Sequence, residues 1–251
     1  MTTRDVLSDG HLQTRPIGNL PAALQHNTVR QRREAGGPEL VGCLAAFLLA
    51  LVLGVLTQPS GAVADTNDPA FADRIAAELG VKPGATVAEV GAGRGEMTVL
   101  MAPKVGTAGR MYANEIDPDR LAEIRQRVAD AGFGNVTVVT ATATDTGLPA
   151  DSCDAIYMIY VYHHLTDPAA YDRSILRALR PGGALFIADF YPTWLLGGMG
   201  VPQPQLVEQL TAAGFQTVHE LTNCPPSRVF RQYCVLFRKP AATNSASAAT
   251  H

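Results

Sequence analysis

The hydrophobic residues of this chain are unevenly spread, and the densest apolar run lies near the N-terminus. Leu40–Leu56 contains no polar side chain except Cys43, arginines at positions 30, 32 and 33 precede it, and Ala62-Val63-Ala64 follows it. A basic stretch, an apolar core and an A-x-A site are typical of a secretory signal peptide. Because its 17 residues are near the minimum for crossing a bilayer, an uncleaved membrane anchor is the alternative. A buried core helix is disfavoured, since the run has no polar face.

The segments around this run, and the far end of the chain, are expected to lack a packed fold. Residues 1–39 are polar and irregular, which predicts a disordered lead or a mis-annotated start that carries the basic region of the targeting segment at 40–64. A twin-arginine signal is disfavoured, because Glu34 and two glycines soon follow the arginine pair. Residues 241–251 are mostly small, which predicts a disordered tail.

Between residues 65 and 240, short apolar runs alternate with segments of helical periodicity, which predicts one domain. The expected strands are 85–90, 110–114, 136–140, 154–159, 184–189, 215–221 and 232–237. The expected helices are 69–79, 96–105, 118–131, 168–179 and 203–213. This alternation predicts an α/β fold with a doubly wound, Rossmann-like and mostly parallel sheet of about seven strands. The last two strands lack an intervening helix, so they are expected to form an antiparallel hairpin at the sheet edge.

The composition limits the kinds of partner that the protein can bind and bears on the compartment in which it works. The 251 residues are 47% hydrophobic with a net charge of −3, which excludes wholesale disorder and offers no basic field for nucleic acid. Four cysteines are too few for a disulfide scaffold. Cys224 and Cys234 flank the predicted hairpin, and a disulfide between them or two buried thiols are both open. No metal-ligand spacing occurs, so no metal is expected.

The strongest chemical signal is a glycine-rich turn, Gly91-Ala92-Gly93-Arg94-Gly95, between the first strand and a helix. The dinucleotide pattern is G-x-G-x-x-G, whereas here Glu96 stands at the last glycine position, where it would repel a diphosphate. A cationic or phosphate-free ligand suits this turn better, which disfavours a nicotinamide oxidoreductase. Glu115 ends the second strand, where a carboxylate can bind the hydroxyls of a ribose. The competing Asp117 precedes a proline and better fits a helix cap.

With these motifs in register, residues 68–239 resemble the class I S-adenosylmethionine-dependent methyltransferases, in the methyltransferase type 11 or UbiE-like branch. Further segments carry the same resemblance. They are the loop 142–149 after the third strand, the strand entry 151–156, Val161-Tyr162-His163-His164-Leu165 and the L-x-P-G-G segment 179–183. The resemblance implies that S-adenosyl-L-methionine is the cofactor and that a small-molecule acceptor takes its methyl group by in-line displacement.

The resemblance also implies a set of cofactor-binding residues. Those expected near the methionine part are Glu89, Gly91, Ala92, Gly93 and Gly95, those near the ribose are Glu115 and Ile116, and those near the adenine are Thr142 and Ala143. The backbone around Met158 is expected to lie near the reacting centre. The chain departs from the family at Thr142, where many relatives carry aspartate. The adenine amino group would then meet Thr142, Asp145 or a backbone carbonyl.

On the acceptor side, His163, rather than His164, is expected to face the site as a general base, and a packing or capping histidine is the alternative. The other side chains expected to line the acceptor pocket are Tyr160, Tyr162, Tyr191 and Trp194. The apolar segment 190–204 predicts a substrate lid and hence a hydrophobic or amphipathic acceptor. The other functional reading is a non-catalytic or divergent ligand-binding protein of the same fold at the membrane.

The targeting segment and the expected cofactor point to different compartments, because S-adenosylmethionine is made in the cytoplasm. The segment 40–64 predicts an exported, periplasmic or membrane-anchored protein, with possible membrane association through 40–56. Arginines before the apolar run favour an N-terminus inside and a domain outside. A cytoplasmic location follows if the segment is an artefact of the start or an anchor that leaves the domain inside.

Overall fold

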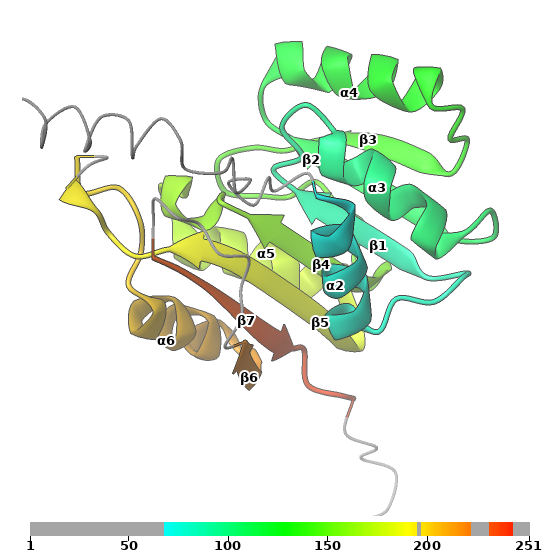
Figure 1. Cartoon of the computed structure of the whole chain (residues 1–251). Helices are drawn as coiled ribbons and strands as arrows, with labels where there is room; N and C mark the ends of the chain where they lie inside the picture. The colour runs from blue at the N-terminus through cyan, green and yellow to red at the C-terminus, as the bar shows by residue number, and fades with distance from the viewer. Residues whose placement is uncertain (1–67, 195–196, 222–230, 243–251) are drawn as a thin grey trace, which may run out of the picture. The chain divides into compact units, whose positions relative to one another are not determined.

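A computed structural model of the chain describes residues 68–194, 197–221 and 231–242 (Figure 1). The chain divides between residues 59 and 60 into two units, and every described residue belongs to the second. The lead at 1–39, the targeting segment at 40–64, Cys224 and most of the tail at 241–251 lie outside the described residues, so the predictions made for them stay predictions. In the part that the structure describes, no helix combines the length and the apolar content needed to span a membrane.

The described strands form one seven-stranded sheet in the order β3-β2-β1-β4-β5-β7-β6. Their bounds are β1 Thr86–Val90, β2 Arg110–Glu115, β3 Val136–Thr140, β4 Cys153–Ile159, β5 Leu179–Phe190, β6 Gln216–Leu221 and β7 Gln232–Arg238. Strands β1 to β5 pair in parallel. Strand β7 lies between β5 and β6 and is antiparallel to both. The predicted α/β sheet with an antiparallel edge hairpin is therefore confirmed.

Helices connect most of the parallel strands, as the sequence periodicity predicts, whereas residues 141–152 join β3 to β4 as a loop. Their bounds are α2 Pro69–Leu79, α3 Glu96–Val105, α4 Pro118–Asp130, the short 3₁₀ turn η1 Tyr162–His164, α5 Pro168–Ala178 and α6 Gln203–Ala213. Three of them begin at an Asp-Pro pair, in which the carboxylate of Asp68, Asp117 or Asp167 accepts a backbone N–H of the first turn. The proline follows at a position that needs no N–H donor, so these pairs fix where α2, α4 and α5 start.

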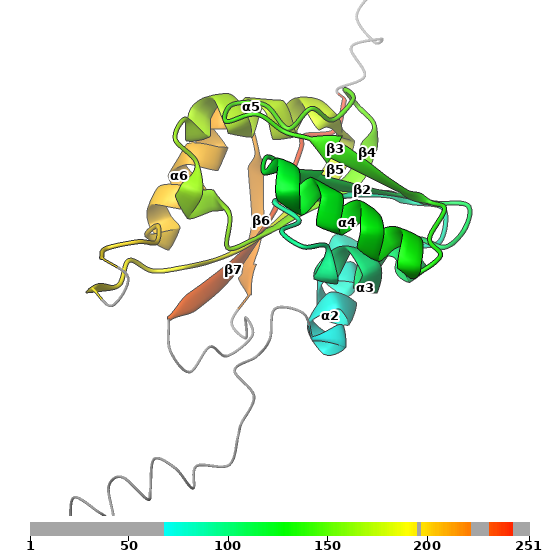
Figure 2. The same ribbon diagram turned by 90° about the horizontal axis from the view of Figure 1, so that it is seen from above.

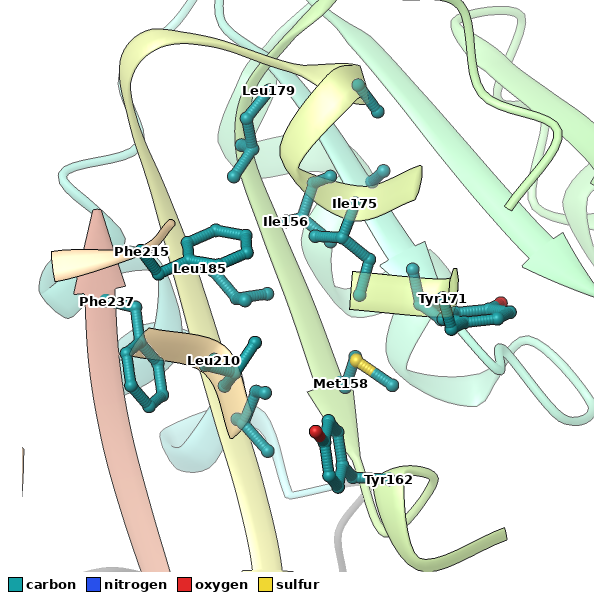
Figure 3. Close-up of a cluster of buried hydrophobic side chains, with 14 of the residues drawn as sticks. Ile156, Met158, Tyr162, Tyr171, Ile175, Leu179, Leu185, Leu210, Phe215 and Phe237 are labelled. Atoms are coloured by element: carbon teal, nitrogen blue, oxygen red, sulfur yellow. The ribbon is translucent and has the colours of Figure 1, made fainter. Parts of the chain in front are cut away.

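The sheet lies between two helical layers, which Figure 2 shows from above. Helices α2, α3 and α4 cover one face and α5 and α6 cover the other. Alternation along β4 separates the two cores, because Ala155 and Tyr157 pack under α2 and α3 whereas Ile156 and Met158 point to α5 and α6. Figure 3 shows the second core, in which Met158 is fully buried.

One local prediction needs correction. The sequence predicts a fifth strand at 184–189, but β5 begins at Leu179 and includes the segment Arg180–Gly183. The pairing of β4 with β5 shifts register between Cys153 and Ala155, so the Pro-Gly-Gly sequence forms a bulge rather than an end. Backbone bonds to Lys239, just past β7, hold the bulge in the sheet.

The cysteine predictions are settled only in part. Cys153 is a buried free thiol on β4, and Cys234 is buried on β7. Because Cys224 lies outside the described residues, its pairing with Cys234 stays a prediction.

Candidate active site

A cleft of about 640 Å³ lies at the carboxyl ends of the parallel strands. The strand order reverses there, because the chain runs from β1 outward to β2 and β3 and returns to β4 on the other side of β1. Ligands of open α/β sheets bind at such a switch point. Eight of the ten predicted cofactor-binding residues line the cleft, namely Glu89, Gly91, Ala92, Gly93, Glu115, Ile116, Thr142 and Ala143.

The glycine turn after β1 forms one wall of the cleft. Gly91 has a φ of +71°, and a Cβ at this position would lie 2.4 Å from Cγ2 of Val161. Gly93 has a φ of +57°, but a Cβ there would meet no atom within 4 Å. The first glycine is therefore required by the protein's own packing, whereas the second leaves an open cradle that a ligand can fill.

Two predicted cofactor residues do not line the cleft. Gly95 is the N-cap of α3, and a Cβ there would lie 3.4 Å from the side chain of Ile124, so this glycine lets α3 approach α4. The side chain of Met158 is fully buried in the core between the sheet and α5 (Figure 3). At the end of β4, Ile159 and the following Tyr160 reach the cleft.

Glu115 stands at the end of β2 with its carboxylate fixed by backbone donors. Its Oε2 accepts the N–H of Gly93 at 2.8 Å, and its Oε1 accepts the N–H of Ile116 at 2.8 Å. The side chain is 6% exposed, yet it lines the cleft. A carboxylate oxygen has more than one lone pair, so both oxygens can accept further hydrogen bonds from a ligand. The prediction of a preorganised hydroxyl-binding carboxylate at this position fits this geometry.

Glu89 lies on β1 beneath the glycine turn and is almost completely buried. Its Oε2 accepts the hydroxyl of Thr98 on α3, and Tyr157 on β4 is its neighbour in the sheet. Burial raises the pKa of Glu89 to about 8, against the weaker opposing effect of the Thr98 hydrogen bond. Burial therefore favours the protonated form of this carboxyl group.

The loop after β3 builds the opposite end of the cleft. Thr142 and Ala143 line it, and the Thr142 hydroxyl accepts the N–H of Asp145 at 3.0 Å. Both carboxylate oxygens of Asp145 instead accept hydrogen bonds from Arg177 at 2.9 Å. Hydrogen bonding from the Gly147 N–H is the main cause that lowers the pKa of Asp145. Of the three adenine partners considered, Thr142 and the backbone around it lie at the cleft, and Asp145 is already engaged.

At the end of β4, Tyr160 has the unusual φ of +56°, and its N–H donates to Ala188 O on β5. A bulky residue in this region of φ costs about 1–2 kcal/mol, so the surrounding sheet must hold it there. The tyrosine lines the cleft as predicted and packs edge-on against Phe190, with ring centroids 5.7 Å apart.

The two histidines are placed opposite to the expectation. The ring of His163 is 3% exposed, its Nδ1 lies 2.9 Å from Oδ1 of the buried Asp189, and it is absent from the lining of the cleft. His164 lines the cleft and lies against His163, with ring centroids 3.9 Å apart. Burial, followed by the charge of His163, lowers the pKa of His164. His163 is bound to the carboxylate of Asp189 on β5, so His164 faces the cleft.

Three residues predicted to line the acceptor pocket lie elsewhere. The Tyr162 hydroxyl donates to Asp172 Oδ2 on α5 at 2.9 Å, which turns the ring into the core (Figure 3). The Tyr191 hydroxyl donates to Gln203 at 2.6 Å, at the start of α6. Trp194 is 87% exposed and does not contact the cleft. Residues 195 and 196 of the predicted lid lie outside the described residues, so the lid stays a prediction.

Comparison with known proteins agrees with this geometry. Residues 88–187 match the family described as methyltransferase domain. This part of the chain is therefore similar to methyltransferase domains. The curated relatives that it matches include the ubiquinone/menaquinone biosynthesis C-methyltransferase UbiE of Vibrio vulnificus, 33% identical over 112 residues, or 44% of this chain and 43% of that protein. UbiE of Shewanella woodyi gives the same identity over 44% of this chain and 45% of its own length. The chain thus spans less than half of these relatives.

Solved structures share the fold of the methyltransferase domain. A SAM-dependent methyltransferase from Aquifex aeolicus superposes with a TM-score of 0.58 at 23% identity, over 74% of this chain and 96% of that one. The [4+2]-cyclase SpnF superposes with a TM-score of 0.61 at 17% identity, over 69% of this chain and 82% of that one. The likeness shows a shared fold, and the family match together with the UbiE relatives supports S-adenosylmethionine as the cofactor.

Sequence reasoning missed several residues that line the cleft of the methyltransferase domain. Asn114 comes just before Glu115 on β2, and its side chain donates to Thr146 O. Tyr171 on α5 and Arg120 on α4 also line the cleft. Asn114 could have been found, because an amide in an otherwise apolar strand end needs a partner. Tyr171 and Arg120 carry no such signal, since each looks like an ordinary helix residue.

The charges of the cleft fit the cofactor of this class. Four carboxyl side chains line it, namely Glu89, Glu96, Glu115 and Asp117, against the single arginine Arg120. S-adenosylmethionine carries a sulfonium and an ammonium cation and no phosphate, so a net acidic cleft favours it over a dinucleotide. Among the described residues, no group of three or more His, Cys, Asp or Glu side chains is placed to hold a metal ion.

Proposed function

We propose that this protein transfers the methyl group of S-adenosylmethionine to a small hydrophobic or amphipathic acceptor by in-line displacement. The observation that carries the proposal is the cleft at the β1/β4 switch point, where the open cradle at Gly93 adjoins the fixed carboxylate of Glu115. The bound donor supplies an electrophilic methyl group on a sulfonium. The protein's contribution is to position the donor and acceptor and to exclude water.

On the donor side, the chain offers a complete set of binding groups. Glu115 accepts hydrogen bonds from ribose hydroxyls with a carboxylate that backbone N–H groups already hold in place. Thr142 and Ala143 flank the base, and the acidic lining favours the cations of the donor. Because these groups are fixed before binding, little conformational entropy is lost on complex formation.

On the acceptor side, Tyr160, His164 and Leu165 form the wall beyond the glycine turn. Burial lowers the pKa of His164, which favours the neutral ring that can accept a proton from a hydroxyl or carbon acid. The Asp189–His163 pair behind it holds the ring stack in place. The names of the UbiE relatives point to C-methylation in quinone biosynthesis, which makes apolar aromatic compounds the first acceptors to test.

Binding of S-adenosylhomocysteine, measured by calorimetry, tests the donor half of the proposal. Glu115→Gln keeps the shape but removes the charge and one acceptor, and it should weaken binding at least tenfold. Glu208→Gln, an exposed charge change on α6, is the matched control and should bind as the wild type does. Transfer of label from methyl-labelled donor to apolar aromatic acceptors tests the other half. Failure of the wild type to bind either donor or product would refute the proposal.

We further propose that the segment 40–64 directs the protein to the membrane or out of the cytoplasm. The support is the sequence pattern of a basic stretch, Leu40–Leu56 and the Ala62–Ala64 site. Sequencing the N-terminus of the protein purified from cells distinguishes the outcomes. Cleavage predicts a mature start at Asp65, an anchor predicts an intact segment in the membrane fraction, and an intact protein in the soluble fraction contradicts both.

A further inference from the structure

Glu89 is a buried carboxylic acid, and the groups around it suit both its protonated and its ionised form. It is 5% exposed, and the groups that face it are Glu115 from β2, Tyr157 from β4 and Thr98 and Glu96 from α3. Among the described residues it forms no ion pair, and its well-formed side-chain hydrogen bond is with the neutral hydroxyl of Thr98. A carboxyl group without a countercharge, near two other acids, is favoured in its protonated form.

The same place also contains an unused donor. The hydroxyl of Tyr157 is fully buried close to the Glu89 carboxyl group, but no well-aligned hydrogen bond joins it to any of the described residues. Tyr157 and Glu89 are directly paired positions of adjacent strands, so their side chains leave the same face of the sheet. The pKa of Tyr157 is raised, first by burial and then by the proximity of Glu89. A buried hydroxyl with no acceptor is costly, whereas an ionised Glu89 would provide one.

We propose that Glu89 is protonated in the ligand-free protein and releases its proton when a cation of the donor is placed over it, and that Thr98 and Tyr157 then both donate to its carboxylate. The O–H bond of the carboxyl group breaks, the proton passes to buffer, and the negative charge that remains balances the ligand cation. This inference rests on the proposed function, because it takes S-adenosylmethionine as the ligand. It makes Thr98 and Tyr157 positioning residues.

Proton coupling has a direct consequence for affinity. Release of close to one proton predicts that cationic ligands bind up to tenfold more tightly for each pH unit between about 6 and 7. A neutral ligand that occupies the same cleft gains nothing from the change. Proton release by Glu89 therefore favours ligands that carry an ammonium or sulfonium cation. While the site is empty, no charge has to be buried at Glu89.

Calorimetry of the full-length protein in phosphate and Tris buffers at pH 7 tests the proposal. The buffers differ in their heat of ionisation, so the dependence of the binding heat on the buffer counts the protons released. S-adenosylmethionine and S-adenosylhomocysteine should each release close to one proton more from the wild type than from Glu89→Gln. The difference between the two proteins is the readout, because the amino group of the ligand also titrates near neutral pH.

Three controls make the readout specific. Glu208→Gln removes an exposed acid on α6 that neither faces Glu89 nor lines the cleft, and it should leave the proton count unchanged. Tyr157→Phe should bind with weaker pH dependence, because the ionised carboxylate loses a donor. 5′-Methylthioadenosine has neither cation and should release no proton from any variant.

A ligand-free measurement separates this inference from the proposed function. The infrared difference spectrum between the wild type and Glu89→Gln at pH 7 should contain the carbonyl band of a protonated carboxylic acid. Carboxylate bands in its place, or equal proton release by the two proteins, would overturn the inference even if the donor binds. Absence of any binding, with the protonated band present, would instead count against the proposed function.

Discussion

Replacement of Gly91 by alanine tests how the glycine turn is packed. The added Cβ would lie 2.4 Å from Cγ2 and 2.9 Å from Cγ1 of Val161, which no rotation of a β-branched side chain can fully relieve. The backbone also has a φ of +71°, which costs an L-residue about 1–2 kcal/mol. Overpacking adds about 1–3 kcal/mol. The expected loss of unfolding free energy is therefore about 2–5 kcal/mol.

Gly93→Ala is the matched control for this change. Its φ is +57°, but the added Cβ would contact nothing within 4 Å, so only the backbone cost of about 1–2 kcal/mol applies. Its Cβ would enter the cleft, so Gly93→Ala should weaken S-adenosylhomocysteine binding more than its small effect on stability suggests. The two glycines thus separate a folding requirement from a ligand requirement.

Urea denaturation measures both variants and the double variant Gly91→Ala with Val161→Ala. The smaller side chain should remove the clash, so the two substitutions together should cost about 1–3 kcal/mol less than the sum of their separate costs. The slope m should stay constant, so that the shift in midpoint reports stability. Equal midpoints for Gly91→Ala and Gly93→Ala, or strict additivity with Val161→Ala, would refute the argument.

Further predictions concern buried groups. The pKa of Glu89 is raised from 4.5 to about 8, so between these pH values the folded protein keeps a proton that the unfolded chain loses. The free energy of unfolding should therefore fall by about 1.4 kcal/mol for each pH unit from 4.5 to 8. Urea titrations of Glu89→Gln should show a much smaller fall over this range. Burial raises the pKa of Asp172 from 3.8 to about 6, so the free energy of unfolding should also fall with rising pH between these two values. Asp172→Asn should remove this fall, and an unchanged pH profile of stability would contradict the prediction. Met158→Ala should cost about 2–5 kcal/mol in unfolding free energy and leave S-adenosylhomocysteine affinity within twofold, since this buried side chain does not line the cleft; a large loss of affinity would contradict the placement.

Much of the donor site could be predicted from the sequence, because its signals are local. The turn Gly91–Gly95 joins a strand to a helix that adjoin it in sequence, and Glu115 ends the next strand. Both features depend on backbone conformation and strand order, which hydrophobic periodicity and glycine spacing already indicate. The carboxyl ends of parallel strands then meet at one sheet edge without further information.

The acceptor side could not be predicted in the same way. The sequence gives His163 and His164 similar surroundings, and the choice between them depends on Asp189, 26 residues away on β5. Tyr162 is likewise turned into the core by Asp172. A side chain at a strand end is oriented by its hydrogen-bond partner, and that partner comes from an element that only packing brings near.

The sequence by itself therefore determined the alternation of strands and helices, the helix starts at Asp-Pro pairs and the class of the nucleotide-like site, since each depends on contacts within a few residues. The tertiary structure decided that β7 inserts between β5 and β6, that the Pro-Gly-Gly segment at 181–183 is a bulge, and which histidine faces the ligand. It also decided that the pKa of Glu89 is raised, because α3 and β4 bury its carboxyl group.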